Sequence, residues 1–493
     1  MNVETSNPTL SEQLPFTLDH DLVIDTLREA SNRAKQFHKT ILASFTQKFM
    51  WHDTIQAFTG ARQANLGECF FWEQPEEQTA LIGIGAATTI ETHGRTCFTD
   101  SATEWRELMN AAVICYTEGA EHIPGSGPVL FGGFAFDTLS PRTQRWSEFP
   151  DGLLILPHYL LSYSSDHATL TINSMIEVTD SIESKMRQIE EDLSRLQTVI
   201  KQSSNIALEQ TTVHFSIYES RPSSEWMKMV AYVVEKIRQG TFEKVVLARE
   251  IQLELEDAMQ SFDIISTLQR LRENYPGAYV FAIQRGESFF VGATPERLVL
   301  AQDGQIHTMA LAGSVRRGDT YVEDMQLGAE LLQSEKKINE HVIVVSMVQE
   351  ALKNHCTNVQ VSATPQLLKL KNLQHLQTPI TGDLIPGRCI LDVMSELHPT
   401  PAVGGFPRDA ALEEIRNTEK LDRGWYAGPL GWIGSGGHGE FAVALRSGLV
   451  DNTKATLFAG CGIVSSSDPQ IEYEESWWKF QVMLRGLGGN SQG

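Results

Sequence analysis

Four pairs of short apolar segments, each pair joined by a tight turn, constrain the fold of this chain more than any other feature. The pairs are residues 279–283 with 289–293, 298–301 with 306–311, 430–433 with 441–446, and 448–450 with 456–459. The connecting turns contain glycine, aspartate or asparagine, as in Asp303-Gly304, which is typical of β-hairpins. Helical patterns lie between the hairpins, so the sequence favours an α+β fold over a doubly wound parallel sheet.

The helical patterns also suggest how the chain is divided. Residues 182–200 carry apolar side chains at spacings of three and four, which predicts a helix with one buried face. A second helix is predicted at residues 226–238, and a polar stretch around residues 202–210 separates the two. We therefore expect an N-terminal α/β part, residues 1–215, and a second part, residues 216–493, that carries most of the chemistry.

The chain is strongly acidic, with a formal net charge of −22 over 493 residues. Such a charge repels nucleic acid and anionic membranes, so we expect neither as a partner. No signal-peptide pattern is present, the apolar runs are too short to span a bilayer, and the six cysteines show no CxxC pair. These features predict a cytoplasmic protein without a disulfide framework or structural zinc. An anionic substrate would need local cations to offset the global charge.

Two apolar strands are interrupted by a charged residue. Lys244 opens the strand in residues 242–249; it can reach the surface through its long side chain, or lie in a dry cleft where burial lowers its pKa and lets the amine act as a base. In residues 289–297, Pro295 ends a strand and presents Glu296. That glutamate can cap the next turn, or remain protonated and serve as a general acid.

Three further segments carry polar residues in turns or at helix starts. Residues 309–318 end in small residues and two arginines, a turn that can hold a carboxylate or simply lie at the surface. Residues 336–341 contain Glu340, residues 460–479 contain several acidic residues, and Glu472 and Glu475 share a helix face because they are three residues apart. If the two acidic clusters converge, they form an oxygen-ligand site suited to Mg²⁺; otherwise each is an exposed acidic turn.

The five segments, in this order and spacing, resemble the chorismate-utilising enzymes, a family that includes isochorismate, anthranilate, aminodeoxychorismate and salicylate synthases. Residues 396–405 and 424–432 join the match, which covers about residues 220–490, while residues 131–137 resemble the N-terminal part of the family. The resemblance implies the family's α+β fold: large antiparallel or mixed sheets packed as a sandwich with helices outside, as in the anthranilate and aminodeoxychorismate synthases.

The resemblance also implies roles for the matched positions. Lys244 is similar to the base that activates water for attack at ring C2, and Glu296 to the acid that protonates the departing C4 hydroxyl. Glu340 and Glu475 match Mg²⁺ ligands, with Glu472 close by, and the metal would hold the ring carboxylate. The remaining matched positions are expected to line the substrate pocket: Arg446 and Tyr426 at the enolpyruvyl carboxylate, His398 at the ring, and Gly313, Ser314, Ala402, Gly460 and Gly462 around it.

Two alanines favour water over ammonia as the nucleophile. Ala312 stands where aminodeoxychorismate synthases carry a nucleophilic lysine, and Ala402 stands where anthranilate synthases carry a threonine. Ammonia-using relatives also lack a lysine equivalent to Lys244. The resemblance therefore implies an isochorismate synthase, an isomerase that acts on chorismate as a monomer without a glutamine amidotransferase subunit. Its length of 493 residues is similar to the menaquinone type.

Three alternatives remain open from the sequence. A salicylate synthase shares the lysine, the acid and the metal site, and goes on to eliminate pyruvate from isochorismate. An isochorismate synthase of a siderophore pathway performs the same reaction in another context. A non-catalytic relative would use the fold to bind a small acid, although the intact set of Lys244, Glu296, Glu340 and Glu475 argues against it.

Overall fold

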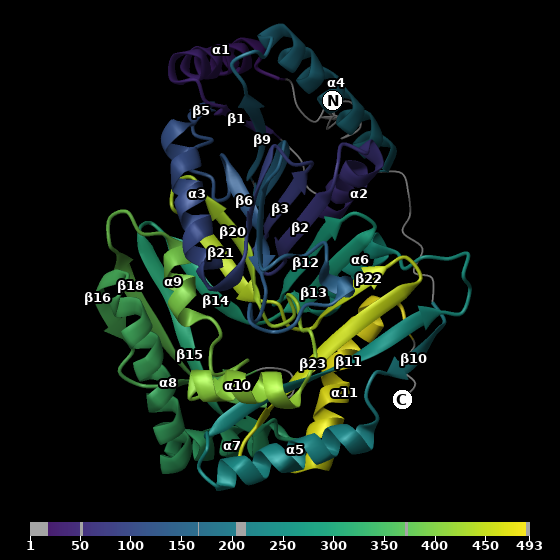
Figure 1. The fold of residues 1–493 in the computed structure, drawn as a ribbon, viewed down its shortest axis with the longest axis vertical. Helices are drawn as coiled ribbons and strands as arrows, with labels where there is room; N and C mark the ends of the chain where they lie inside the picture. Colours follow the sequence, from purple (N-terminus) through teal and green to yellow (C-terminus); the bar gives the residue numbers. More distant parts are fainter. Residues whose placement is uncertain (1–17, 50–52, 166, 204–212, 370–372, 490–493) are drawn as a thin grey trace, which may run out of the picture.

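The computed structural model describes residues 18–49, 53–165, 167–203, 213–369 and 373–489, and two large sheets form its centre (Figure 1). The strands of the larger sheet, sheet A, are β1 (Ile41–Phe49), β2 (Cys69–Gln74), β3 (Thr79–Ile84), β5 (Val113–Tyr116), β8 (Tyr159–Ser164), β9 (His167–Ile176), β10 (Phe215–Glu219), β11 (Lys244–Leu255), β12 (Tyr279–Arg285), β13 (Ser288–Thr294), β19 (Gly405–Phe406), β22 (Ser447–Asp451) and β23 (Lys454–Ile463). They lie in the order β10-β11-β23-β22-β13-β12-β2-β3-β8-β9-β1-β5, and β19 pairs with β11.

In the second sheet, sheet B, the described strand pairs are antiparallel. Its strands are β4 (Thr88–Thr92), β6 (Val129–Phe134), β7 (Gly152–Leu156), β14 (Arg297–Gln302), β15 (Gln305–Arg316), β16 (Cys356–Val361), β17 (Gln366–Lys369), β18 (Leu373–Leu384), β20 (Pro429–Gly434) and β21 (Gly439–Val443). Their order is β16-β18-β15-β14-β21-β20-β6-β7-β4, and β17 pairs with β18. The pairs β12–β13, β14–β15, β20–β21 and β22–β23 confirm the four predicted hairpins. The pair β1–β5 is parallel, so sheet A is mixed.

Helices surround the two sheets. They are α1 (His20–Phe37), α2 (Thr54–Ala64), α3 (Cys97–Ala111), α4 (Ile182–Ser203), α5 (Ser223–Arg238), α6 (Ile264–Asn274), α7 (Tyr321–Gln333), α8 (Glu335–Lys353), α9 (Ile390–Leu397), α10 (Arg408–Thr418) and α11 (Pro469–Gly486), with short 3₁₀ turns at Gly94–Thr96 and Gln144–Trp146. Figure 1 shows α1 and α4 at one end of the molecule and α5 and α7 at the other. The predicted helices at residues 182–200 and 226–238 are confirmed as α4 and α5.

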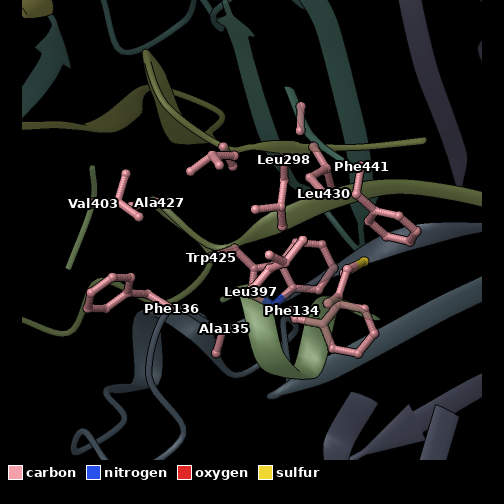
Figure 2. Packing of buried hydrophobic residues seen from close by; sticks show 14 of the residues in the cluster. Phe134, Ala135, Phe136, Leu298, Leu397, Val403, Trp425, Ala427, Leu430 and Phe441 are labelled. Carbon is pink, nitrogen blue, oxygen red and sulfur yellow. The ribbon is translucent and has the colours of Figure 1, made fainter. Parts of the chain in front are cut away.

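The hydrophobic core lies between the sheets and under the helices. Phe131 of β6 stacks on Phe70 of β2 with ring centroids 4.2 Å apart, which joins sheet B to sheet A. Phe134, three residues further along β6, points to the opposite face and packs on Phe98 of α3 at 4.4 Å, because strand side chains alternate. Figure 2 shows Phe134 close to Phe441 in this layer. The predicted α+β sandwich with outer helices is therefore confirmed.

The two predicted parts of the chain share both sheets. Strand β2 pairs with β12 in sheet A, and β6 pairs with β20 in sheet B. The division at residue 215 stays a prediction, and residues 204–212 of the polar stretch beside it lie outside the described residues. None of the helices in the described ranges has the length and apolar character that a membrane-spanning helix needs.

Replacing Phe131 by alanine tests the contact between the sheets. Phe131 is fully buried, so we expect Phe131→Ala to lower the free energy of unfolding by about 3–5 kcal/mol, measured by urea denaturation. Met259 is 94% exposed, and Met259→Ala serves as the control with a change within about 0.5 kcal/mol. Equal effects of the two substitutions would contradict this view of the core.

Candidate active site

The site begins where the chain crosses between the sheets at two neighbouring points. One crossover joins β13 to β14 and carries Glu296; the other joins β21 to β22 and carries Arg446. Backbone hydrogen bonds join the two: Val443 N–H donates to the Glu296 carbonyl at 2.9 Å, and Ala293 N–H donates to the Arg446 carbonyl at 3.1 Å. The Thr294 hydroxyl also donates to the Val443 carbonyl at 2.6 Å. The crossovers therefore hold an acid and an arginine side by side.

Lys244 lies at the start of β11, near these crossovers. Its side chain passes over Gly462 of β23, where an added Cβ would lie 2.9 Å from Lys244 Cε and 3.5 Å from Nζ. Any larger residue at position 462 would displace the amine. Burial lowers the pKa of Lys244, while the negative charge of Glu296 acts in the opposite direction. The structure thus places the predicted base within electrostatic reach of the predicted acid.

The pKa of Glu296 shifts in the direction opposite to that of Lys244. Burial raises the pKa of its carboxyl group above the usual range, while Lys244, Arg446 and Lys479 act to lower it. The net direction is upward, so a larger fraction of this carboxyl group is protonated at neutral pH than for an exposed glutamate. The pair therefore combines an amine that loses its proton more easily with a carboxyl group that keeps its proton longer.

Two predicted metal ligands meet at the start of α11. Oxygens of Glu472 and Glu475 and the Cys461 sulfur lie within 4.8 Å of one another. Burial raises the pKa of Cys461 to about 12, and its thiol donates to the Glu472 carbonyl at 3.2 Å, so it remains protonated. Burial, followed by the neighbouring Glu475, raises the pKa of Glu472. Two adjacent carboxylates that repel each other fit a hard divalent cation such as Mg²⁺, which prefers oxygen ligands.

The third predicted ligand is placed differently. Glu340, in the first turns of α8, is half-buried and accepts a hydrogen bond from Lys337 at 3.4 Å. It does not belong to the group that Glu472 and Glu475 form within the described ranges. Its negative charge nevertheless acts against the lowering of the Lys244 pKa, so Glu340 lies near enough to Lys244 to interact with it electrostatically. Its role as a ligand stays a prediction.

A second lysine, which the sequence analysis missed, completes the cationic side of the site. Lys479 pairs with Glu475 at 2.5 Å and donates to the Gly460 carbonyl at 2.7 Å. Its positive charge acts to lower the pKa of Lys244, and it acts against the upward shift that burial gives the pKa of Glu296. Because Lys479 follows Glu475 by one helical turn, the shared helix face could have revealed it.

His375, a histidine that the sequence analysis did not single out, lies among the charged groups of the site. Burial lowers its pKa to about 4, followed by the charges of Lys244 and Lys479, while Glu475 acts in the opposite direction. The predicted ring neighbour, His398, instead donates from Nε2 to the Phe136 carbonyl at 2.9 Å, and burial lowers its pKa to about 4. His375 carried no motif signal in the sequence; only the pairing of β15 with β18 brings it to the site.

The structure also describes the surroundings of Tyr426, Gly460 and Gly313. Tyr426 is buried, stacks on Phe458 at 5.3 Å and has a raised pKa because of burial. A Cβ at Gly460 would lie 3.1 Å from its hydroxyl oxygen, so this glycine lets the tyrosine approach β23. Gly313 has a positive φ of 76° at an irregularity in β15, directly before Ser314.

Together with Glu296, Ala402 lines a small hollow of about 20 Å³, and part of this hollow is open to solvent. The loop that carries Ala402 begins at His398 and ends in β19, which pairs with the first residues of β11. The loop therefore lies between the lysine strand and the acid.

Among the described residues, the middle of the strand that carries Lys244 has no strand partner on one edge. β19 pairs with β11 at Lys244, and β10 pairs only with its far end. Between them, Ala248 N–H donates to the Glu419 carboxylate at 2.7 Å, and Arg423 donates to the Val246 carbonyl at 2.7 Å. Glu419 and Arg423 also pair with each other at 2.6 Å, fully buried. This ion pair therefore replaces a neighbouring strand.

Arg249 of β11 anchors α11. Its guanidinium donates to the Ser476 hydroxyl at 2.9 Å and to Glu219 at 2.5 Å, and it lies 4.4 Å from the ring centroid of Tyr473. Ser476 and Tyr473 are the immediate sequence neighbours of the acidic residues on α11. The contacts of Arg249 therefore hold the turn of α11 that carries Glu472 and Glu475.

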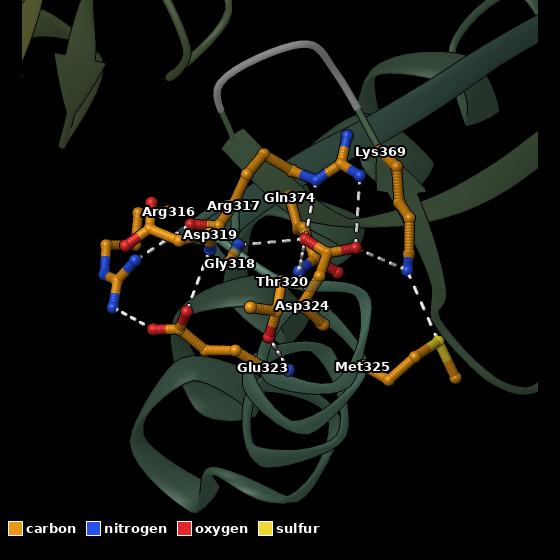
Figure 3. Close-up of polar contacts among 10 residues, drawn as sticks. All are labelled: Arg316, Arg317, Gly318, Asp319, Thr320, Glu323, Asp324, Met325, Lys369 and Gln374. Atoms are coloured by element: carbon orange, nitrogen blue, oxygen red, sulfur yellow. Dashed lines mark hydrogen bonds and ion pairs between the residues drawn. The ribbon is translucent and has the colours of Figure 1, made fainter.

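The two arginines of residues 309–318 form ion pairs with acidic residues of the protein. Figure 3 shows Arg317 and Lys369 on the carboxylate of Asp324, at 2.6 and 2.9 Å. Gln374 also donates to that carboxylate at 2.9 Å, and Arg316 pairs with Glu323. These contacts hold the end of β15 to α7 and to β18, the strand of His375. Hydrogen bonds from Arg317 and Lys369 hold the pKa of Asp324 well below its usual range.

The amino-acid sequence is similar to those of known proteins over most of its length. The family model described as "Chorismate binding enzyme" matches residues 27–488. The chain is 35% identical over 463 residues to the isochorismate synthase MenF of Bacillus subtilis, covering 93% of this chain and 96% of that protein. It is also 35% identical over 467 residues to the salicylate biosynthesis isochorismate synthase of Pseudomonas aeruginosa, covering 94% of each.

A comparison with solved structures finds a fold similar to that of an isochorismate synthase. The structure of MenF, the menaquinone-specific isochorismate synthase from Escherichia coli, matches with a TM-score of 0.72 and 25% identity, covering 94% of this chain and 100% of that one. The family match begins at residue 27, so it includes the N-terminal region that the sequence motifs matched only through residues 131–137.

The environment of Lys244 can be tested by titration. We expect the ¹³C resonance of methylated Lys244 to titrate below the usual range of a lysine, because burial lowers its pKa. Glu296→Gln removes a negative charge that raises this pKa, so the midpoint should move further down. Lys244→Ala assigns the signal. A midpoint for Lys244 in the usual range of a lysine would contradict the buried position.

Proposed function

This chain belongs to the family of chorismate-binding enzymes, and from that premise we propose that it is an isochorismate synthase, which converts chorismate to isochorismate. The observation that best supports the proposal is the pair formed by Lys244 and Glu296, whose pKa values move in opposite directions. The reaction needs a base for water and an acid for a hydroxide leaving group at the same time. Each such proton transfer typically accelerates a reaction by about a hundred- to ten-thousandfold.

The proposed proton transfers balance. Lys244 accepts a proton from water as the water oxygen bonds to ring C2, and the ring double bonds shift as the C4–O bond breaks. Glu296 gives its proton to the departing hydroxyl, which leaves as water. One water enters and one leaves, so substrate and product are isomers. Lys244 ends protonated and Glu296 ends ionised, and a proton must pass from one to the other before the next cycle.

The substrate is a dianion that enters an acidic protein, so the local cations have a specific task. Arg446 stands beside Glu296 on the neighbouring crossover and would contact the enolpyruvyl carboxylate together with Tyr426. Glu472 and Glu475 would hold Mg²⁺, with Glu340 as a further ligand. The metal, when bound, supplies positive charge that offsets the ring carboxylate.

Several finer features of the proposal rest on supporting observations. Ala312 and Ala402 stand where ammonia-using relatives carry lysine and threonine, which supports water as the nucleophile. Nearly full-length similarity to two MenF proteins supports the menaquinone type without an amidotransferase subunit, and we propose that the protein acts as a monomer. All six cysteines are free thiols, which supports a cytoplasmic location.

A second candidate function follows from a specific relative. The salicylate biosynthesis isochorismate synthase of Pseudomonas aeruginosa matches as fully as MenF does, so isochorismate made here could serve salicylate formation. A salicylate synthase proper would also eliminate pyruvate from isochorismate. The two reactions differ in their products, and a product analysis distinguishes them.

Incubation of the purified protein with chorismate and Mg²⁺ tests the proposed reaction. We expect isochorismate as the product, without pyruvate or salicylate fluorescence. Lys244→Ala should lower kcat about a hundredfold or more because the base is lost. Lys454→Ala, which removes an exposed lysine, is the matched control and should retain full activity. Accumulation of salicylate would refute the assignment, and full activity of Lys244→Ala would refute the base.

The proposed metal ligands can be tested on α11. Glu475→Gln removes a carboxylate charge, so the Mg²⁺ concentration for half-maximal rate should rise about tenfold or more. Mn²⁺ binding, followed by electron paramagnetic resonance, should weaken in parallel. Glu474→Gln, on the exposed side of the same helix, is the control and should change neither quantity. Unchanged metal affinity in Glu475→Gln would exclude this residue as a ligand.

A further inference from the structure

The hollow beside Glu296 has a role that the proposed reaction leaves unassigned. It lies between sheet B, α8 and the loop of residues 400–402. Its walls are mainly apolar and include Leu298, Met309, Leu311, Val344 and Val348. Glu296 and Ala402 line the same hollow, so it adjoins the proposed site of the ring.

Thr400 brings an unusual polar group to this hollow. Its hydroxyl oxygen is buried and has no hydrogen-bond partner among the described protein atoms. A buried hydroxyl without a partner is unfavourable by about 1–3 kcal/mol, so such groups normally bind water or a ligand. Thr400 and Glu296 both line the hollow, which brings the unpartnered hydroxyl and the proposed acid to one space.

The other polar residue of the lining is already engaged. Arg297 donates to the Glu440 carboxylate at 3.3 Å, and Glu440 also accepts from the Tyr279 hydroxyl at 2.6 Å. Glu296 and Thr400 are therefore the groups of the lining that can bind a small polar molecule. Two partners between apolar walls suffice for one water molecule but not for a charged ligand.

We propose that Thr400 and Glu296 form a subsite for the water molecule that leaves ring C4. The inference rests on the proposed function, since that reaction releases one water beside the acid. When the C4–O bond breaks, the oxygen takes its bonding electron pair and the proton of Glu296. The resulting water donates to the Glu296 carboxylate and binds the Thr400 hydroxyl. The apolar walls offer the released molecule no other hydrogen-bond partner, and the subsite holds it apart from the water at C2.

The proposal predicts a specific kinetic pattern. Thr400→Val keeps the side-chain shape and removes the hydroxyl, so kcat should fall about five- to tenfold, the effect of one hydrogen bond. The KM for chorismate should change less than about twofold, because the contact forms only as water leaves. Thr400→Ser restores the hydroxyl and should recover most of kcat. Thermal unfolding of the three proteins checks that their stability is similar.

Other kinetic outcomes would overturn the subsite. A raised KM with unchanged kcat would mean that Thr400 binds the substrate itself. Equal losses in Thr400→Val and Thr400→Ser would indicate packing rather than the hydroxyl. Unchanged kinetics in Thr400→Val would show that the hydroxyl has no part in the reaction.

A crystal structure of the wild-type protein gives a second test that is independent of activity. We expect one ordered water within hydrogen-bond distance of both Thr400 Oγ1 and a Glu296 carboxylate oxygen, absent from Thr400→Val. A dry hollow in the wild-type crystal would overturn the proposal even if isochorismate is formed. Formation of salicylate would instead refute the proposed function, so the two failures are distinguishable.

Discussion

The paired crossovers between the two sheets are the constraint on which the rest of the site depends. Glu296 and Arg446 lie where the chain leaves one sheet for the other, and backbone hydrogen bonds between residues 293–296 and 443–446 join the two passages. Side chains at a crossover belong to neither sheet face, so they can point into the space beside the sheets instead of into the core. The acid and the arginine are therefore positioned by main-chain contacts, which are more rigid than contacts between long side chains.

The electrostatics of the site reverse those of the whole molecule. The chain has a net charge of −22, yet Lys244, Arg446 and Lys479 act together on Glu296. Burial disfavours the charged form of any group, and for this reason it lowers the pKa of the lysine and raises that of the glutamate. The same physical effect thus prepares a base and an acid, and the surrounding cations favour an anionic substrate without removing the difference between them.

Polar contacts of three buried charged groups support the elements that carry this chemistry. Arg249 holds α11, the pair of Glu419 and Arg423 completes the edge of β11, and Asp324 joins β15 to α7 and β18. Buried ion pairs often add little net stability, because desolvation offsets their attraction. Their value here is geometric, since each one orients an element relative to the next and loses its partner if that element moves.

The sequence by itself determined the local structure and the identity of the matched residues. Hairpin turns and helical periodicity depend on neighbouring residues, so the four hairpins, α4 and α5 were predictable, and ordered motifs identified Lys244, Glu296 and the carboxylates of α11. Only the tertiary structure decided that His375 lies near Lys244 and Lys479, that Arg316 binds Glu323 and Arg317 binds Asp324, and that Cys461 rather than Glu340 groups with Glu472 and Glu475 among the described residues. These are contacts between distant segments, and their geometry depends on how the two sheets and α8 pack, which no local pattern encodes.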